Sequence, residues 1–228
     1  MNTSSPLRLL QETLLLIPCS KHKQPGHKPS NAISILATLD PARAAALANA
    51  RAALRQKAQL DEKTLMPAYV RYDGQLYRQG STSIGKAVAA GQRVLIVSGC
   101  YGLLLADEPI GMYEKSFVLS DWPGGLLEEC ILDYARHTGI RSIVAVMAST
   151  TAYAKFVQRV NWRKAGLEAT LASPVAHGGG ASGKVPRAQG QAVAALITRG
   201  LDQDWLSSEG LDQDWLSSDS LSLKTESL

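Results

Sequence analysis

Apolar runs and helical patterns alternate along this chain. Four short runs rich in leucine, isoleucine, valine and alanine predict strands, at residues 13–17, 93–98, 143–148 and 168–172. The longest of these runs are apolar at successive positions, which is typical of strands buried on both faces of a sheet. We therefore expect an α/β fold with a mixed, largely parallel sheet flanked by helices.

Between the strands, the sequence has the spacing and the end signals of helices. The predicted helices cover residues 41–59, 83–90, 126–136, 151–160 and 188–199. Asp40 and Pro41 begin the first helix as an N-cap and a first-turn proline. Ser149 or Thr150 is the expected N-cap of the helix at residues 151–160.

A change of composition at residue 200 separates a basic body from an acidic tail. We interpret residues 1–199 as a single α/β domain. Residues 200–228 are rich in serine and acid and contain a ten-residue direct repeat, 200–209 and 210–219. This composition predicts a flexible tail. Trp205 and Trp215 suit a tail that docks on the body or on a partner, but we favour a local duplication without a function of its own.

The formal net charge of +4 conceals an asymmetry. The tail has seven acids and one base, which leaves residues 1–199 with 23 bases, 13 acids and a net charge of +10. A body of this charge favours an anionic partner such as a nucleic acid or a nucleotide. A basic surface without such a partner is the alternative interpretation.

The chain has no feature of a membrane protein or a secreted protein. No apolar run reaches the roughly 18 residues that span a bilayer, and residues 14–17 are too short for the core of a signal peptide. Cys19, Cys100 and Cys130 lack CxxC spacing, which fits reduced thiols. We expect a cytoplasmic protein with no membrane partner. The sequence does not indicate an oligomeric state.

Residues 98–102, with the sequence Ser-Gly-Cys-Tyr-Gly, follow the second predicted strand directly. The two glycines allow a positive φ or a close approach of the backbone to a ligand. In α/β proteins, ligands bind at the carboxyl ends of strands. The segment therefore predicts one wall of a binding site, to which we add Tyr113, eleven residues after Gly102.

Positive charge gathers after the first strand, where Lys21 has two further lysines and two histidines within seven residues. Such a cluster favours a phosphate, or it lowers the pKa of Cys19 and makes the thiol a nucleophile. A buried, unreactive thiol is the more common state of a free cysteine. The spacing of Cys19, His22 and His27 does not match a zinc site, and we expect neither a metal nor another cofactor.

Two further segments carry candidate ligand contacts. Asp73-Gly74 marks a turn close to Tyr77, where tyrosines stack on a base or pack a helix against the sheet. Residues 177–187 are rich in glycine and end with Lys184 and Arg187. They are not a P-loop, because Val185 stands where Ser or Thr would bind magnesium. An anion site at a helix N-terminus and a plain surface loop are the two interpretations.

Taken in order, these segments resemble the YaaA family of peroxide-stress proteins. The resemblance covers residues 10–199 and rests on residues 14–21, 39–43, 72–77, 98–103 with Tyr113, 148–155, and Lys184 with Arg187. Within residues 18–21, Lys21 matches the family's Ser-Pro-Ala-Lys, and the last segment is a looser form of its Lys-Ala-Arg-Gly. The resemblance implies an α/β fold on a mixed sheet and a helix-hairpin-helix-like element among the N-terminal helices. It also implies DNA binding and protection against oxidative DNA damage.

Two functions follow from these observations. The first is a YaaA-like DNA-binding protein of the oxidative-stress response, which protects DNA through phosphate contacts from the basic helical segment at residues 40–60. Its expected DNA-binding residues are Arg43, Arg51, Arg55 and Lys57. The second is an enzyme of N-glycosidase or base-transferase type acting on a nucleobase or nucleotide, with Lys21, Tyr77 and Ser98 as catalytic residues. The expected ligand-binding residues are Ser20, Lys21, Gly74, Tyr77, Ser98, Gly99, Tyr101, Gly102, Tyr113, Ser149, Lys184 and Arg187.

Overall fold

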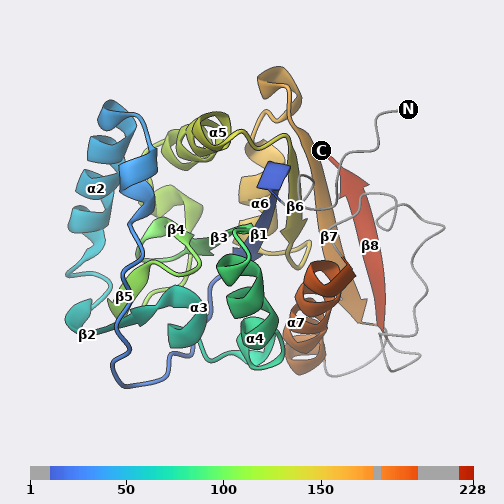
Figure 1. Cartoon of the computed structure of the whole chain (residues 1–228), viewed down its shortest axis with the longest axis horizontal. Helices are drawn as coiled ribbons and strands as arrows, with labels where there is room; N and C mark the ends of the chain where they lie inside the picture. Colours follow the sequence, from blue (N-terminus) through green and yellow to red (C-terminus); the bar gives the residue numbers. More distant parts are fainter. Residues whose placement is uncertain (1–10, 177–180, 200–220) are drawn as a thin grey trace.

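The computed structural model describes residues 11–176, 181–199 and 221–228 and has a six-stranded sheet at its centre. The strands lie in the order β4-β3-β1-β6-β7-β8 (Figure 1). The four central strands, β3 (Arg93–Ser98), β1 (Thr13–Pro18), β6 (Ser142–Val146) and β7 (Glu168–Ala176), are parallel. At the two edges, β4 (Gly102–Leu105) and β8 (Leu221–Ser227) pair in the antiparallel direction. The expected mixed, largely parallel sheet is confirmed.

Strand β1 has no solvent-facing side. Leu14, Leu15, Leu16 and Ile17 are all 0% exposed. Side chains alternate between the faces of a strand. Leu14 and Leu16 therefore join the hydrophobic core on one face of the sheet, while Leu15 and Ile17 join the core on the other. This burial explains the continuous apolar run in the sequence.

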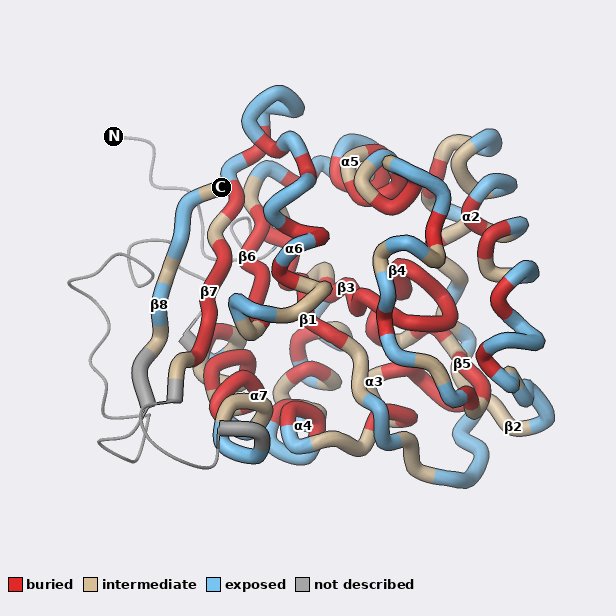
Figure 2. The backbone as a smooth tube through the Cα atoms, turned by 180° about the vertical axis from the view of Figure 1, so that it is seen from behind, coloured by how far each residue is buried: buried red, intermediate tan, exposed pale blue. Residues whose placement is uncertain are grey.

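Helices cover both faces of the sheet (Figure 1). Helices α4 (Gln75–Ala89) and α7 (Ala181–Arg199) pack together on one face, and α2 (Pro41–Leu54), α5 (Leu126–Thr138) and α6 (Ala152–Arg159) pack on the other. The buried stripes of these helices are visible in Figure 2. Asp40 caps α2 as expected, because its carboxylate accepts a hydrogen bond from the Ala42 N–H at 3.0 Å. No helix in the described part of the chain is long and apolar enough to cross a membrane.

The remaining elements are short and lie outside the main sheet. Strands β2 (Asp61–Pro67) and β5 (Pro109–Met112) form a separate antiparallel pair, and α3 (Ala68–Arg71) follows β2 directly. Three 3-10 turns complete the described structure: η1 (Ile35–Thr38), η2 (Leu119–Asp121) and η3 (Arg163–Ala165). In the region where the family resemblance implies a helix-hairpin-helix-like element, α2 follows the single turn η1 and leads into β2.

Helices α4 and α7 begin earlier than the sequence predicted. The first half of α4 contains Gly80 and several Ser and Thr residues, which are weak helix formers. It is stabilised by α7, which packs along it. In α7, Gly183 and Pro186 lie in the first two turns, and neither residue is typical of a helix interior, so the sequence pattern does not indicate a helix there. Lys184 and Arg187 therefore lie within the helix and not in a loop before it.

The prediction of a flexible tail is wrong for the last residues of the chain. Strand β8 pairs with β7 over seven residues, from Ala176–Leu221 to Thr170–Ser227. A strand exposed along one edge needs few apolar side chains, so the polar sequence of β8 does not prevent pairing. The ten-residue repeat with Trp205 and Trp215 lies outside the described residues, as do residues 177–180 of the glycine-rich segment.

Candidate functional site

The order of the strands creates a crevice at the carboxyl ends of β1 and β6. From β1 the chain passes to β3 on one side of the crevice, and from β6 it passes to β7 on the other side. The loop after β1 lies against the N-terminus of α4, where the Asp73 N–H donates to the His22 carbonyl at 2.9 Å. The turn after β6 instead leads to α6, on the opposite face of the sheet. Open α/β sheets bind ligands where two such connections diverge.

A cavity of about 380 Å³ occupies this crevice, and we call it the strand-end cleft. Its walls come from the end of β1, the first turn of α4, the connection from β6 to α6, and the first turns of α7. The lining residues are Pro18, Cys19, Ser20, Lys21, His22, Gly74, Gln75, Leu76, Ala148, Thr151, Tyr153, Val185, Pro186 and Gln189.

The N-terminus of α4 opens on the strand-end cleft. Gly74 is the N-cap residue, and no side chain caps the helix. A Cβ atom at Gly74 would lie 2.2 Å from Ser20 Oγ, so glycine allows the loop after β1 to lie against the helix end. The first N–H groups of a helix lack intrahelical partners and attract anions. Lys21 and His22 add basic side chains to the same cavity.

Cys19 and Tyr153 form a hydrogen-bonded pair in the wall of the cleft. The Sγ and Oη atoms are 3.2 Å apart. The Tyr153 ring stacks on Phe117 with ring centroids 5.1 Å apart, and burial raises the pKa of the phenol. The Cys19 N–H donates to the Val97 carbonyl at 2.9 Å, which fixes the thiol at the end of β1. The pair therefore supplies a thiol and a neutral phenol to a ligand.

Gln189 brings a buried amide to the cleft. Its side chain is 6% exposed, and Nε2 donates to the Val146 carbonyl at the end of β6 over 3.5 Å. The next residue, Gly190, lies against α4, where an added Cβ would be 2.3 Å from the Leu76 carbonyl oxygen. The missing side chain allows α7 to approach α4 closely and places Gln189 beside the cleft.

Three of the expected ligand-binding residues line the cleft: Ser20, Lys21 and Gly74. Lys184 and Arg187 are exposed on α7, whereas Val185 and Pro186 of the same turns face the cavity. The orientation of these four residues depends on the start of α7, which Gly183 and Pro186 obscure in the sequence.

Ser149 is exposed in the turn before α6, and neither it nor Thr150 is the N-cap. The cap is Thr151, whose Oγ1 accepts from the Ala154 N–H at 3.4 Å. The same oxygen donates to the Ala148 carbonyl at 2.7 Å. Thr151 lines the cleft, so the hydroxyl expected at this strand end is present two residues later.

Tyr77 lies behind the wall of the cleft. It is 1% exposed, and its hydroxyl donates to the Pro18 carbonyl at 2.8 Å. Burial raises the pKa of Tyr77 well above its ordinary value, so the phenol remains a neutral donor. Tyr77 therefore holds the end of β1, which carries Cys19 and Lys21, in place.

Ser98, Tyr101 and Tyr113 belong to a buried polar network at the end of β3. Ser98 Oγ accepts from the Tyr101 N–H at 3.1 Å and lies 3.0 Å from Tyr113 Oη. Tyr113 Oη in turn lies 2.8 Å from Tyr72 Oη. Burial raises the pKa of each of these three tyrosines. The network closes the Ser-Gly-Cys-Tyr-Gly turn and does not line the strand-end cleft.

The two glycines of this turn allow neighbouring parts of the chain to pack closely against its backbone. A Cβ at Gly99 would lie 2.4 Å from the Lys115 carbonyl oxygen. Gly102 has the expected positive φ, +71°, and a Cβ there would press on Leu127 and Trp122. At Gly99, the close approach is made by the backbone of residues 115–116 and not by a ligand, as the sequence had suggested.

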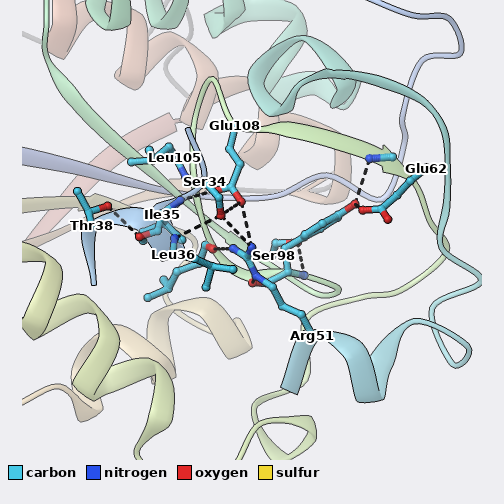
Figure 3. A network of polar contacts seen from close by, with 12 residues as sticks. Ser34, Ile35, Leu36, Thr38, Arg51, Glu62, Ser98, Leu105 and Glu108 are labelled. Carbon is cyan, nitrogen blue, oxygen red and sulfur yellow. Dashed lines mark hydrogen bonds and ion pairs between the residues drawn. The ribbon is translucent and has the colours of Figure 1, made fainter. Parts of the chain in front are cut away.

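The four basic residues expected to contact DNA are ion-paired within the protein. Arg51 pairs with Glu108 at 3.0 Å and is 13% exposed (Figure 3). Its Nε and Nη2 atoms also donate to the carbonyls of Tyr101 and Leu103. The other three pairs are more exposed: Arg55 with Glu62, Lys57 with Asp121, and Arg43 with Asp40, Glu129 and Asp133. In this structure, Arg51 is a structural residue, and the charge of the other three is partly compensated.

No protein-family model matches this chain, and no curated protein is significantly similar to it. The function is therefore argued from the geometry and chemistry of the site. Among the residues that the structure describes, no three His, Cys, Asp or Glu side chains lie close enough together to hold a metal ion.

Proposed function

We propose that the strand-end cleft binds a nucleotide or nucleobase ligand and that the chain is an enzyme acting on that ligand. One observation carries the proposal. An uncapped helix N-terminus, Lys21, apolar walls and a buried amide converge on one cavity at the carboxyl ends of β1 and β6. Its volume of about 380 Å³ lies within the range of roughly 300–1,000 Å³ that is usual for small-molecule sites.

Each part of a nucleotide has a counterpart in the cleft. The N–H groups at the start of α4 and the Lys21 ammonium suit a phosphate. Pro18, Leu76 and Pro186 offer apolar surface to a flat ring. The edge of a nucleobase carries hydrogen-bond donors and acceptors, and the Gln189 amide is suited to bind such an edge.

The cleft also holds groups for proton transfer. Cleavage or transfer at a glycosidic bond needs a proton donor for the leaving group. The Cys19–Tyr153 pair lines the cavity and contributes a thiol and a phenol hydroxyl to it. Of the three catalytic residues expected from the sequence, Lys21 lines the cleft, while Tyr77 and Ser98 hold the strand ends behind it.

Nucleotide binding is expected to raise the melting temperature of the full chain. A ligand at about 100 times its Kd stabilises the folded state by about 2.7 kcal/mol, or roughly 5–10 °C for a chain of this size. Differential scanning fluorimetry with nucleobases, nucleosides, nucleotides and inorganic phosphate measures the shift. Lys21→Ala should reduce the shift for phosphate-bearing ligands because it removes a cation from the cleft.

Lys63→Ala is the matched control, because Lys63 is an exposed lysine on β2 that does not line the cleft. The proposal is wrong if no ligand in the panel stabilises the wild-type chain. It is also wrong if the two lysine variants reduce the shift equally. Incubation of stabilising nucleosides with the protein, followed by chromatography for the free base, tests the reaction itself.

DNA binding, as the resemblance to the YaaA family implies, is the second candidate. The net charge of +10 on residues 1–199 favours it. Since the basic residues of α2 are ion-paired, we place the phosphate contacts on the exposed segment after β1. This segment includes Lys21, His22, His27 and Lys28.

Gel-shift titration is expected to show DNA affinity that falls steeply with salt, because phosphate contacts release counterions. The double variant Lys21→Ala/Lys28→Ala should weaken binding more than Arg55→Ala/Lys57→Ala, which removes two cations that already have partners. A larger loss in the second variant would instead place the interface on the basic segment at residues 40–60. Absence of a shift at low salt would exclude DNA binding.

A further inference from the structure

A second cavity lies at the amino end of β3, at the edge of the sheet opposite to the carboxyl ends of β1 and β6 that form the strand-end cleft. Its volume is about 200 Å³. Residues from the turn before β3, from the segment around η1, from the end of β4 and from α5 line it. The lining residues are Ile33, Thr38, Val88, Gly91, Gln92, Arg93, Val94, Leu105, Asp107 and Tyr134. We call it the Gln92 cavity.

Three polar side chains of the Gln92 cavity have a buried atom that makes no hydrogen bond of standard geometry. The atoms are Gln92 Nε2, Arg93 Nε and Tyr134 Oη. Gln92 is 6% exposed and Tyr134 is 0% exposed. Seven such atoms occur in the described part of the chain, and three of them belong to this one cavity. Buried polar groups are nearly always satisfied, so a cluster of unsatisfied ones indicates a missing partner.

The missing partner is a hydrogen-bond acceptor. An amide N–H and a guanidinium N–H are donors, and a neutral phenol also donates. Burial raises the pKa of Tyr134, and both the charge of the neighbouring Arg93 and a hydrogen-bond interaction with its side chain oppose the rise. The phenol is protonated at neutral pH, and its O–H can still donate to an acceptor in the cavity. A carboxylate is the acceptor that binds most strongly to several donors of this kind.

Asp107 adds the opposite charge to the same cavity. Its side chain is half-buried, and this burial raises its pKa. No ion pair among the described residues includes Asp107. An uncompensated carboxylate at this depth suits a cationic group of a ligand.

The rest of the Gln92 cavity is apolar. Val88, Val94 and Leu105 line it, together with Ile33. Ile33 is 58% exposed, and in the described part of the chain one other large hydrophobic side chain, Val118, is exposed. The cavity therefore combines an apolar surface with a cluster of hydrogen-bond donors and a carboxylate.

We propose that the Gln92 cavity binds a free amino acid with an aliphatic side chain. The ligand carboxylate accepts hydrogen bonds from Gln92, Arg93 and Tyr134, and its ammonium group faces Asp107. Its side chain packs on Leu105, Val88 and Ile33. The volume is smaller than that of sites for drug-sized ligands, which fits a molecule of this size. This site is independent of the function proposed for the strand-end cleft.

Isothermal titration calorimetry on the full chain tests the ligand class without a mutation. Leucine carries all three groups, 4-methylpentanoate lacks the ammonium, and 3-methylbutylamine lacks the carboxylate. We expect leucine to bind and each analogue to bind at least about tenfold more weakly, since each loses a charged hydrogen bond. If an analogue bound as tightly as leucine, the contact that we propose for the group it lacks, carboxylate or ammonium, would be wrong.

Two variants test the residues. Gln92→Leu and Asp107→Asn should each weaken leucine binding by about tenfold or more. Lys21→Ala, in the strand-end cleft, should leave it unchanged, and thermal melts confirm that each variant is folded. No heat of binding at millimolar leucine, or affinity that survives both variants, would overturn the proposal. The unsatisfied atoms would then be bound by water alone.

Discussion

Replacement of Arg51 by methionine is expected to lower the free energy of unfolding by about 3–5 kcal/mol, because it leaves a buried carboxylate without its cation. The side chains of Arg51 and Glu108 are 13% and 4% exposed and lie 3.0 Å apart. Glu108 also accepts from the Ser34 hydroxyl at 2.6 Å and from the Ile35 N–H at 3.0 Å (Figure 3). These bonds hold the carboxylate in place, so it cannot move to solvent when Arg51 is removed.

Arg55→Met is the matched control, one turn further along the helical segment. Arg55 pairs with Glu62, but its side chain is 52% exposed and solvent screens the pair, so its loss should cost far less than the loss of Arg51. Urea denaturation of both variants measures the difference. Two small and equal losses would contradict the structural role of Arg51. Its charge would then be available for DNA.

Gly190→Ala is expected to destabilise the fold by about 1–3 kcal/mol, the usual cost of an extra methyl group in a packed contact. The new Cβ would lie 2.3 Å from the Leu76 carbonyl oxygen and 2.8 Å from Gln79 Cβ. A carbonyl within a helix cannot turn away as a flexible side chain can. The two helices must therefore separate, which widens the strand-end cleft and weakens nucleotide binding.

Gly183→Ala supplies the comparison within the same helix. An added Cβ at Gly183 meets nothing within 4 Å. Alanine is a better helix former than glycine, so this change should be neutral or stabilise by up to about 1 kcal/mol. Thermal and urea denaturation measure the free energy of unfolding of both variants. Similar behaviour of the two variants would show that α4 and α7 are not in close contact.

The sequence predicted the central strands well because burial on both faces leaves a strong pattern. β3 begins and ends where the apolar run does, and β1 extends one residue further, to Pro18. The sequence did not predict β2, β4, β5 or β8. Strand β2 starts with Asp-Glu-Lys, and β8 lies at an edge, so neither has a continuous apolar run. Their pairing depends on a neighbour that only the fold supplies.

The candidate residues from the sequence lie at several strand ends, and only part of them share a cavity. Lys21 and Gly74 line the cavity at the ends of β1 and β6. Tyr77 and Ser98 were also predicted to line a site at the strand ends. Both are buried behind the wall of the cleft, because their exposure depends on how α4 and β3 pack, which the sequence pattern does not show. The ion pairs of the basic segment at residues 40–60 could not be predicted either, since the partners of Arg51 and Lys57 lie far away in the sequence, at Glu108 and Asp121.

The central position of β1 has a consequence for how the chain acquires its fold. Leu14 pairs with Arg93 on one side and with Ile143 on the other, so both partners are distant in the sequence. Contacts between distant residues form late and slow the folding of a domain. Until residue 142 and its neighbours have emerged from the ribosome, one edge of a strand that is fully buried in the folded protein has no partner. During synthesis, Thr13–Pro18 is therefore the segment of the described chain most in need of protection from aggregation.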